Sequence, residues 1–212
     1  MNDQRPHKHL PPPRLADLGL QPLVAEGERR SGERLRRPKR FRFQLLGDYI
    51  AENFDTICPD GGTRIADVGG GKGMLAYLLG QHGYECTVLD PQYQPLPDKY
   101  RDIRTGKRVR IPTSAEVPHR AVPFETAHGR NYDLLVGLHA HGSNLAMLES
   151  AACHQTSVVL LPCCVIGEPE APAAGQSWFV WLTGRATALG LKVTYFHLNF
   201  KGQNIGFIAA RT

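Results

Sequence analysis

The sequence predicts an α/β fold with a mainly parallel sheet and helices on both faces. Three observations support this prediction. Short apolar runs alternate with helical stretches over residues 64–189, a glycine-rich bend joins the first apolar run to the first of those helices, and two apolar runs near the C-terminus have the pattern of a hairpin. Strands separated by helices imply crossover connections, which place parallel strands side by side. The hairpin adds an antiparallel strand.

The chain is expected to have a flexible arm and one folded domain. Its 212 residues are 42% hydrophobic and 21% charged, as in a single globular domain with a tail. Residues 1–38 are rich in proline and arginine and offer few apolar side chains to bury, so the domain is placed at 39–212. It should open with a helix that ends near Cys58 and docks through an apolar stripe of Phe43, Leu46, Ile50 and Phe54.

The expected elements follow the apolar runs. Strands are predicted over 64–68, 86–89, 132–138, 157–161, 191–198 and 204–210, and helices over 72–82, 143–153 and 176–189. Residues 91–120 hold many charges and prolines without a clear period. They are expected to form a loop with a short helix, followed by one further strand near 121–124.

Several protein classes are excluded by composition. No run of eighteen apolar residues occurs, and the first thirty positions lack the apolar stretch of a signal peptide. The five cysteines form an odd number without paired C-x-x-C spacing, which argues against a disulfide framework or a zinc ribbon. We therefore expect a cytoplasmic protein, although the Arg- and Pro-rich arm also permits mitochondrial import.

Positive charge is concentrated near the N-terminus. The net charge is +5, and residues 28–42 alone hold eight bases against two acids. Such a block is typical of a polyanion partner, because each neutralised phosphate releases condensed counterions. RNA, either tRNA or rRNA, free or within a ribonucleoprotein, is the expected partner, and a solvated or targeting arm is the alternative. The expected RNA contacts are Arg34, Arg36, Arg37, Lys39, Arg40 and Arg42.

The strongest local motif is the bend from Asp67 to Gly73, which reads D-x-G-x-G-x-G. Its glycines permit positive φ and a close approach of a ligand to the backbone at the carboxyl end of the sheet. A dinucleotide fingerprint would need glycine in place of Met74. A P-loop would need glycine in place of Ala66 and Ser or Thr in place of Gly73. Neither phosphate-binding template fits.

This motif resembles the first motif of class I S-adenosylmethionine-dependent methyltransferases. The resemblance implies a Rossmann-like, seven-stranded sheet and S-adenosylmethionine as cofactor. Asp90 ends the second strand about 20 positions after the loop, where an acid can accept both hydrogen bonds of a ribose diol. The cofactor residues expected from the resemblance are Asp67, Gly69, Gly70, Gly71, Gly73, Asp90, Glu125 beside adenine, and Leu138.

A second motif, Leu138-His139-Ala140-His141-Gly142, ends the third clear strand, and Pro162-Cys163-Cys164 ends the next. This pair resembles the class I branch that includes the tRNA acceptor-stem 2'-O-methyltransferases, with a departure at His141, where related proteins often carry cysteine. A neutral imidazole suits removal of a hydroxyl proton near pH 7. His141 is the expected base and His139 the orienting residue. The alternative is that both cap the following helix or bond to backbone.

Cys163 is the third catalytic candidate, and three interpretations of it remain. A thiolate here could attack a pyrimidine, as in RNA 5-methylcytosine enzymes, although those enzymes also carry Pro-Cys where this chain has His139-Ala140. His139, His141 and one cysteine could bind zinc, but no fourth ligand or standard spacing accompanies them, so no metal is predicted. The cysteines could also be small packing residues that line the pocket.

Taken together, these motifs predict a methyltransferase that acts on RNA. One alternative is an enzyme with a protein or small-molecule acceptor. The other is a methyltransferase fold that binds RNA or aids assembly without catalysis. Three aromatic residues at the start of the last helix are expected to pack in the core, with base stacking as the alternative: Trp178, Phe179 and Trp181.

Overall fold

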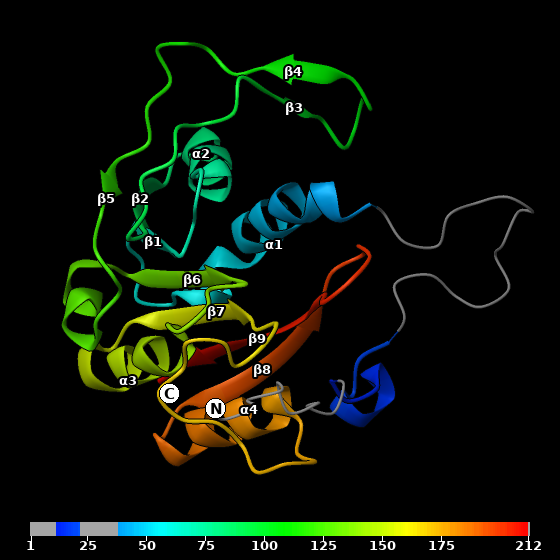
Figure 1. Ribbon diagram of the computed structural model, residues 1–212, viewed down its shortest axis with the longest axis vertical. Coiled ribbons are helices and arrows are strands. Elements are labelled where there is room, and N and C mark those ends of the chain that lie inside the picture. The colour runs from blue at the N-terminus through cyan, green and yellow to red at the C-terminus, as the bar shows by residue number, and fades with distance from the viewer. Residues whose placement is uncertain (1–11, 22–37, 212) are drawn as a thin grey trace, which may run out of the picture.

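A seven-stranded sheet runs through the part of the chain that this computed structural model describes, residues 12–21 and 38–211 (Figure 1). In spatial order the strands are β5 (His119–Arg120), β2 (Glu85–Leu89), β1 (Arg64–Val68), β6 (Leu134–Leu138), β7 (Ser157–Leu161), β9 (Ile205–Ala210) and β8 (Lys192–His197). Every pairing from β5 to β7 is parallel, and β9 is antiparallel to both of its neighbours. The predicted fold class is confirmed.

Helices cover both faces of this sheet. The α-helices are α1 (Arg42–Ile57), α2 (Met74–Gln81), α3 (Asn144–His154) and α4 (Trp178–Ala188). Shorter 3-10 turns are η1 (Leu15–Leu18), η2 (Lys39–Phe41) and η3 (Thr126–Asn131). In Figure 1, α1 and α2 lie on one side of the strands, and α3 and α4 lie on the other.

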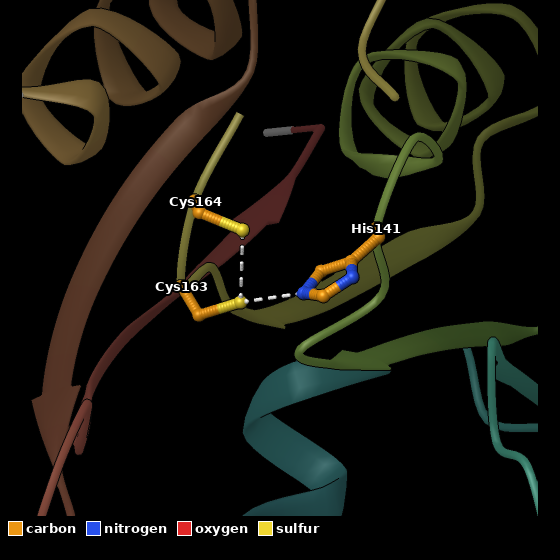
Figure 2. A group of neighbouring side chains, drawn as sticks. All are labelled: His141, Cys163 and Cys164. Carbon is orange, nitrogen blue, oxygen red and sulfur yellow. Dashed lines mark hydrogen bonds between the residues drawn. The ribbon is translucent and has the colours of Figure 1, made fainter. Parts of the chain in front are cut away.

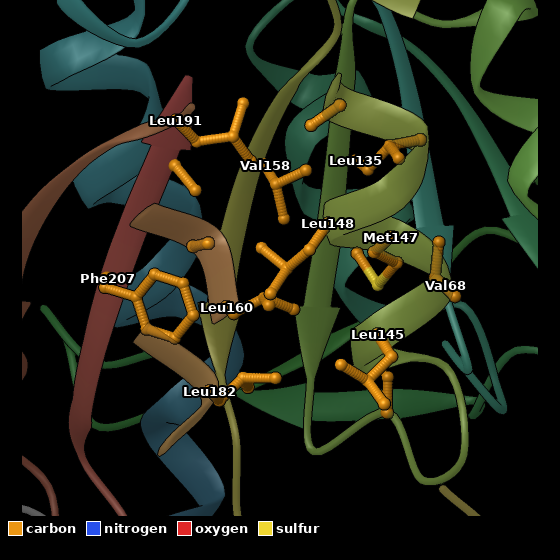
Figure 3. Packing of buried hydrophobic residues seen from close by; sticks show 14 of the residues in the cluster. Val68, Leu135, Leu145, Met147, Leu148, Val158, Leu160, Leu182, Leu191 and Phe207 are labelled. Atoms are coloured by element: carbon orange, nitrogen blue, oxygen red, sulfur yellow. The ribbon is translucent and has the colours of Figure 1, made fainter. Parts of the chain in front are cut away.

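Two cores result from the alternation of side chains along the strands. Leu135 of β6 belongs to the core beneath α3 and α4, whereas Leu134 and Val136 belong to the core beneath α1 and α2. Figure 3 shows the first of these cores, in which α3 contributes Leu145, Met147 and Leu148. Strands with both faces buried read as continuous apolar runs, and this is why periodicity located them so well.

The expected docking helix is α1. Leu46, Ile50 and Ile57 are fully buried in the core beneath α1 and α2. The buried side chain of Gln44 on this helix forms two hydrogen bonds to the backbone of a distant segment, which its place in the helix does not predict. Its Nε2 donates to the carbonyl of Arg101 (2.8 Å), and its Oε1 accepts from the N–H of Ile103 (2.7 Å). These bonds fix α1 to a two-stranded hairpin beside the main sheet.

That hairpin corrects the prediction of a short helix within residues 91–120. It consists of β3 (Lys99–Arg101) and β4 (Arg108–Arg110), which pair antiparallel. The further strand predicted near 121–124 is present but begins earlier, as β5 at His119–Arg120, which pairs with β2. Pro123 has no N–H to donate to a ladder, and Phe124 is buried in the core from a loop.

The described part of the predicted arm contains η1. Leu15 and Leu18 of this turn are partly buried and pack against the core beneath α3 and α4. The remainder of the arm, residues 1–11 and 22–37, lies outside the described residues. Within the described part of the chain, no helix has both the length and the apolar character needed to cross a membrane.

Candidate functional site

The glycine loop between β1 and α2 has the open backbone that the sequence predicts. Gly69, Gly71 and Gly73 all have positive φ, at 63°, 54° and 69°. A side chain at Gly71 would meet nothing closer than the Gln94 amide nitrogen at 3.9 Å. The backbone surface at Gly71 is therefore open to a ligand.

Asp90, at the end of β2, closes this loop from the neighbouring strand. Its Oδ2 accepts from the N–H of Gly71 (2.9 Å), and its Oδ1 accepts from the N–H of Gln92 (2.9 Å). The half-buried carboxylate thus faces the glycine loop. Each oxygen has a second lone pair, so the carboxylate can still accept hydrogen bonds from a ligand.

Asp67 lies beneath the same loop and is only 2% exposed. Its Oδ2 accepts from the N–H of Ala76 (3.3 Å) in the first turn of α2. A Cβ atom on Gly70 would lie 2.5 Å from the Asp67 carboxyl carbon. Burial raises the pKa of Asp67 to about 7, against the opposing effect of the Ala76 N–H. The described contacts of Asp67 therefore support the loop from within the protein.

The glycine loop also touches the histidine motif. A Cβ atom on Gly69 would lie 3.3 Å from both the Cα and the Cβ atoms of Ala140. Strands β1 and β6 are parallel neighbours, so their carboxyl ends meet at one edge of the sheet. The two motifs that the sequence analysis selected are thus brought together.

His139, the first residue after β6, adopts a left-handed backbone with φ 61°. Both of its ring nitrogens are buried and have no hydrogen-bond partner in the described part of the chain. Burial, with smaller contributions from the positive charges of Lys39 and Arg42, lowers the pKa of His139 to about 4. The imidazole is therefore neutral near pH 7. A buried polar group without a partner is unusual, and a catalytic role or a bound molecule is one explanation for it.

His141 is exposed and faces two cysteines (Figure 2). Its Nε2 lies 3.1 Å from the Sγ of Cys163, which in turn lies 3.5 Å from the Sγ of Cys164. Burial, and then Cys164, raises the pKa of Cys163 to about 12, so its free thiol is protonated at neutral pH. A thiol of this kind is a poor nucleophile.

The end of the basic segment lies near the same strand ends. Lys39 and Arg42 are close enough to His139 to influence its pKa, and Lys39 also affects that of Cys163. The Arg42 guanidinium lies 4.2 Å from the centre of the Phe43 ring, and its burial lowers its pKa. Arg40 is exposed. The other expected RNA contacts, Arg34, Arg36 and Arg37, lie outside the described residues.

Two further cofactor candidates occupy different surroundings. Leu138 is 9% exposed and belongs to the core beneath α1 and α2. Glu125 is exposed at the start of η3, where its N–H donates to Nδ1 of His128 (3.0 Å). Nothing in the described contacts links Glu125 to the glycine loop, so its role beside adenine stays a prediction.

A large cavity adjoins the glycine loop at Gly71 to Gly73. It has a volume of about 940 Å³ and is bounded by Gly71 to Gly73, by Tyr93 and by the segments that lead into and out of the β3–β4 hairpin. Sequence reasoning missed this cavity, because the segments around it show no periodicity. The signal available in the sequence was an aromatic residue amid prolines, Tyr93, whose side chain the structure shows to be exposed.

Comparison with known proteins gives structural similarity alone. No family model and no curated protein matches the chain. Among solved structures, DesVI of Streptomyces venezuelae is 12% identical with a TM-score of 0.49, over 82% of this chain and 93% of DesVI. The sugar N-methyltransferase KedS8 of Streptoalloteichus is 14% identical with a TM-score of 0.49, over 89% of this chain and 98% of KedS8.

A third similar structure is magnesium protoporphyrin IX methyltransferase of Synechocystis, crystallised with bound S-adenosylmethionine. It is 12% identical with a TM-score of 0.49, over 81% of this chain and 80% of that protein.

Proposed function

We propose that this protein is an S-adenosylmethionine-dependent methyltransferase whose acceptor is RNA. One observation carries the proposal. The open glycine loop after β1 is closed by the Asp90 carboxylate at the end of β2 and touches Ala140 at the end of β6. In open α/β sheets, ligands bind outside the carboxyl ends of the strands, and both phosphate-binding forms of the loop are excluded by sequence.

The residues present fit this cofactor. The backbone surface at Gly71 is open, and the spare lone pairs of Asp90 suit a ribose diol. When bound, S-adenosylmethionine supplies an electrophilic methyl group. The chain contributes the alignment of the acceptor with that group, which is itself a large part of catalysis.

His139 is the residue that we assign to the acceptor. Its imidazole is neutral near pH 7 and has two unpartnered nitrogens, so it can accept a hydrogen bond from a hydroxyl or amino group of the acceptor. With a pKa of about 4 it is a weak base. Its proposed part is therefore orientation of the acceptor more than complete removal of a proton.

RNA is favoured by the cations beside His139. Lys39 and Arg42 connect the basic segment of residues 28–42 to the strand ends at which His139 stands. A phosphate backbone held by these cations would bring a nucleotide to the same edge of the sheet. A small-molecule acceptor is the second candidate, because the cavity of about 940 Å³ reaches Gly71 and Gly73.

Cofactor binding is tested by calorimetric titration of the full chain with S-adenosylmethionine. Asp90→Asn keeps the shape of the side chain and removes its charge, so we expect affinity to fall roughly tenfold or more. Asp60→Asn is the matched control, because Asp60 is exposed in the turn after α1. Absence of binding by the unaltered protein would contradict the cofactor and favour an assembly factor without catalysis.

The acceptor is tested by transfer of a radiolabelled methyl group to total RNA, total protein and a small-molecule extract. We expect label in RNA. His139→Gln should reduce transfer while leaving cofactor affinity unchanged, since the proposed role of His139 concerns the acceptor. Label confined to protein or to small molecules would remove RNA as the acceptor.

A further inference from the structure

Two loops that are far apart in sequence bring three metal-binding side chains together. His141 follows β6, and Cys163 and Cys164 follow β7, its parallel neighbour, with Leu138 paired to Leu161 at the ends of these strands. The imidazole nitrogen of His141 and the two sulfur atoms all lie within 4.8 Å of one another. Figure 2 shows the imidazole and both thiols converging from the two loops.

The distances suit a single ion. A tetrahedral zinc ion with bonds of about 2.3 Å to sulfur and about 2.0–2.1 Å to nitrogen separates two sulfur ligands by about 3.8 Å and a nitrogen–sulfur pair by about 3.6 Å. The corresponding separations are 3.5 Å between the two sulfur atoms and 3.1 Å between His141 Nε2 and the Cys163 sulfur, and all three ligand atoms lie within 4.8 Å of one another. Small rearrangements of the side chains would bring all three to zinc-ligand distances.

The two loops are joined independently of these side chains. A Cβ atom on Gly142 would lie 2.8 Å from the carbonyl oxygen of Gly167, so the backbones of the two loops are in close contact. The Glu168 carboxylate also caps α3. Its Oε1 accepts from the N–H of Asn144 (2.9 Å), and its Oε2 accepts from that of Leu145 (3.2 Å). These contacts flank the three side chains and hold them near one another without a metal.

We propose that His141, Cys163 and Cys164 form a zinc site. Soft thiolates together with an imidazole favour zinc over hard cations such as magnesium. Each thiol releases its proton when the metal binds. The site goes beyond the proposed methyl transfer and does not depend on it.

The described residues supply three ligands, which leaves the fourth tetrahedral position for water or a substrate atom. Three protein ligands with one open position is the pattern of zinc sites that act on bound molecules, whereas structural sites are closed by four. The three ligands follow the carboxyl ends of β6 and β7, and Ala140, between His139 and His141, contacts the glycine loop. A substrate at this edge of the sheet could therefore meet the ion.

The test is titration of the reduced, metal-free full chain with Co²⁺, followed by displacement with Zn²⁺. Cobalt gives thiolate charge-transfer bands in the near ultraviolet and strong visible bands when tetrahedral. We expect one ion per chain with both signatures. Cys163→Ser and Cys164→Ser should each weaken the charge-transfer bands and lower affinity at least tenfold, and His141→Gln should lower affinity while retaining those bands.

Controls separate this site from other metal-binding groups. Cys153→Ser removes an exposed thiol of α3 and should change nothing. A double variant, His7→Gln with His9→Gln, removes a His-x-His pair that lies outside the described residues, and it should likewise leave both the bands and the affinity unchanged. Thermal unfolding of each metal-free variant shows whether it is folded.

Two results would overturn the site. One is the absence of thiolate bands in the unaltered chain. The other is retention of these bands and of affinity in both folded cysteine variants. Neither result depends on S-adenosylmethionine, so failure here is distinct from failure of the proposed methyl transfer.

Discussion

Gly70 shows how closely the glycine loop is fitted to the strand beneath it. Replacement with alanine would place a methyl group 2.5 Å from the buried Asp67 carboxyl carbon. We expect Gly70→Ala to lower the free energy of unfolding by about 1–3 kcal/mol through this overpacking. Gly80→Ala is the control, because a Cβ atom there meets nothing within 4 Å inside α2. It should be stabilising by about 0.5–1 kcal/mol. Urea denaturation measures the free energy of unfolding of both variants. Equal changes in the two would contradict the close packing of Gly70 against Asp67.

Asp67 should make stability depend on pH. Its folded pKa, raised by burial to about 7, exceeds the unfolded value of about 3.9. Between these values the folded chain keeps a proton that the unfolded chain has released. Its stabilising contribution is therefore complete below about pH 4 and is lost as the pH rises to about 7.

Asp67→Asn should remove this dependence. From pH 4 to 7, the free energy of unfolding of the unaltered protein should fall relative to that of the variant, as urea denaturation at several pH values would show. Asp60→Asn, at an exposed position, should run parallel to the unaltered protein. Parallel behaviour of Asp67→Asn would show that the buried carboxyl group is not protonated.

At the scale of the elements, the side chain of Glu168 caps the N-terminus of α3. Glu168 accepts hydrogen bonds from the N–H groups of Asn144 and Leu145, which begin the helix and have no partner within it. We expect Glu168→Ala to lower the free energy of unfolding by about 1–2 kcal/mol and to speed hydrogen exchange in the first turn of α3. Glu170→Ala, which removes only an exposed pair with Arg185, should change it by less than about 0.5 kcal/mol.

Elements were predictable where burial is continuous. The predicted bounds of β7 match the structure, because Ser157–Leu161 is buried on both faces and reads as one apolar run. The hairpin of β3 and β4 was not predictable, since its strands are short, charged and largely exposed. It is specified by pairing between distant residues and by its bonds to Gln44, which local patterns do not reveal.

The candidate site was predictable as a neighbourhood and not as a set of contacts. Parallel strands bring the ends of β6 and β7 together, so the proximity of the histidines and cysteines follows from topology. The different surroundings of His139 and His141 do not follow from topology. The ring nitrogens of His139 are buried without a partner among the described residues, and only the folded loops show that His141 meets the two thiols.

For the molecule as a whole, the basic segment should dominate RNA affinity. Each neutralised phosphate of a single strand contributes about 0.7 to the slope of log affinity against log salt. Changing Arg36, Arg37 and Arg40 together to glutamine should reduce that slope by about 2. Three exposed cations elsewhere, Arg108, Arg130 and Lys192, form a control of equal charge. An equal loss of slope in both triple variants would show that RNA binding is not localised.

The two-residue strand β5 forms one border of the main sheet. Pro118 and Pro123 stand close on either side of it, and neither has an N–H to offer to another chain. An extended peptide at this edge would find very few backbone groups with which to form the hydrogen bonds of an added strand. On that border the fold itself discourages edge-to-edge pairing of sheets from different molecules, and substitution of the two prolines would weaken that protection.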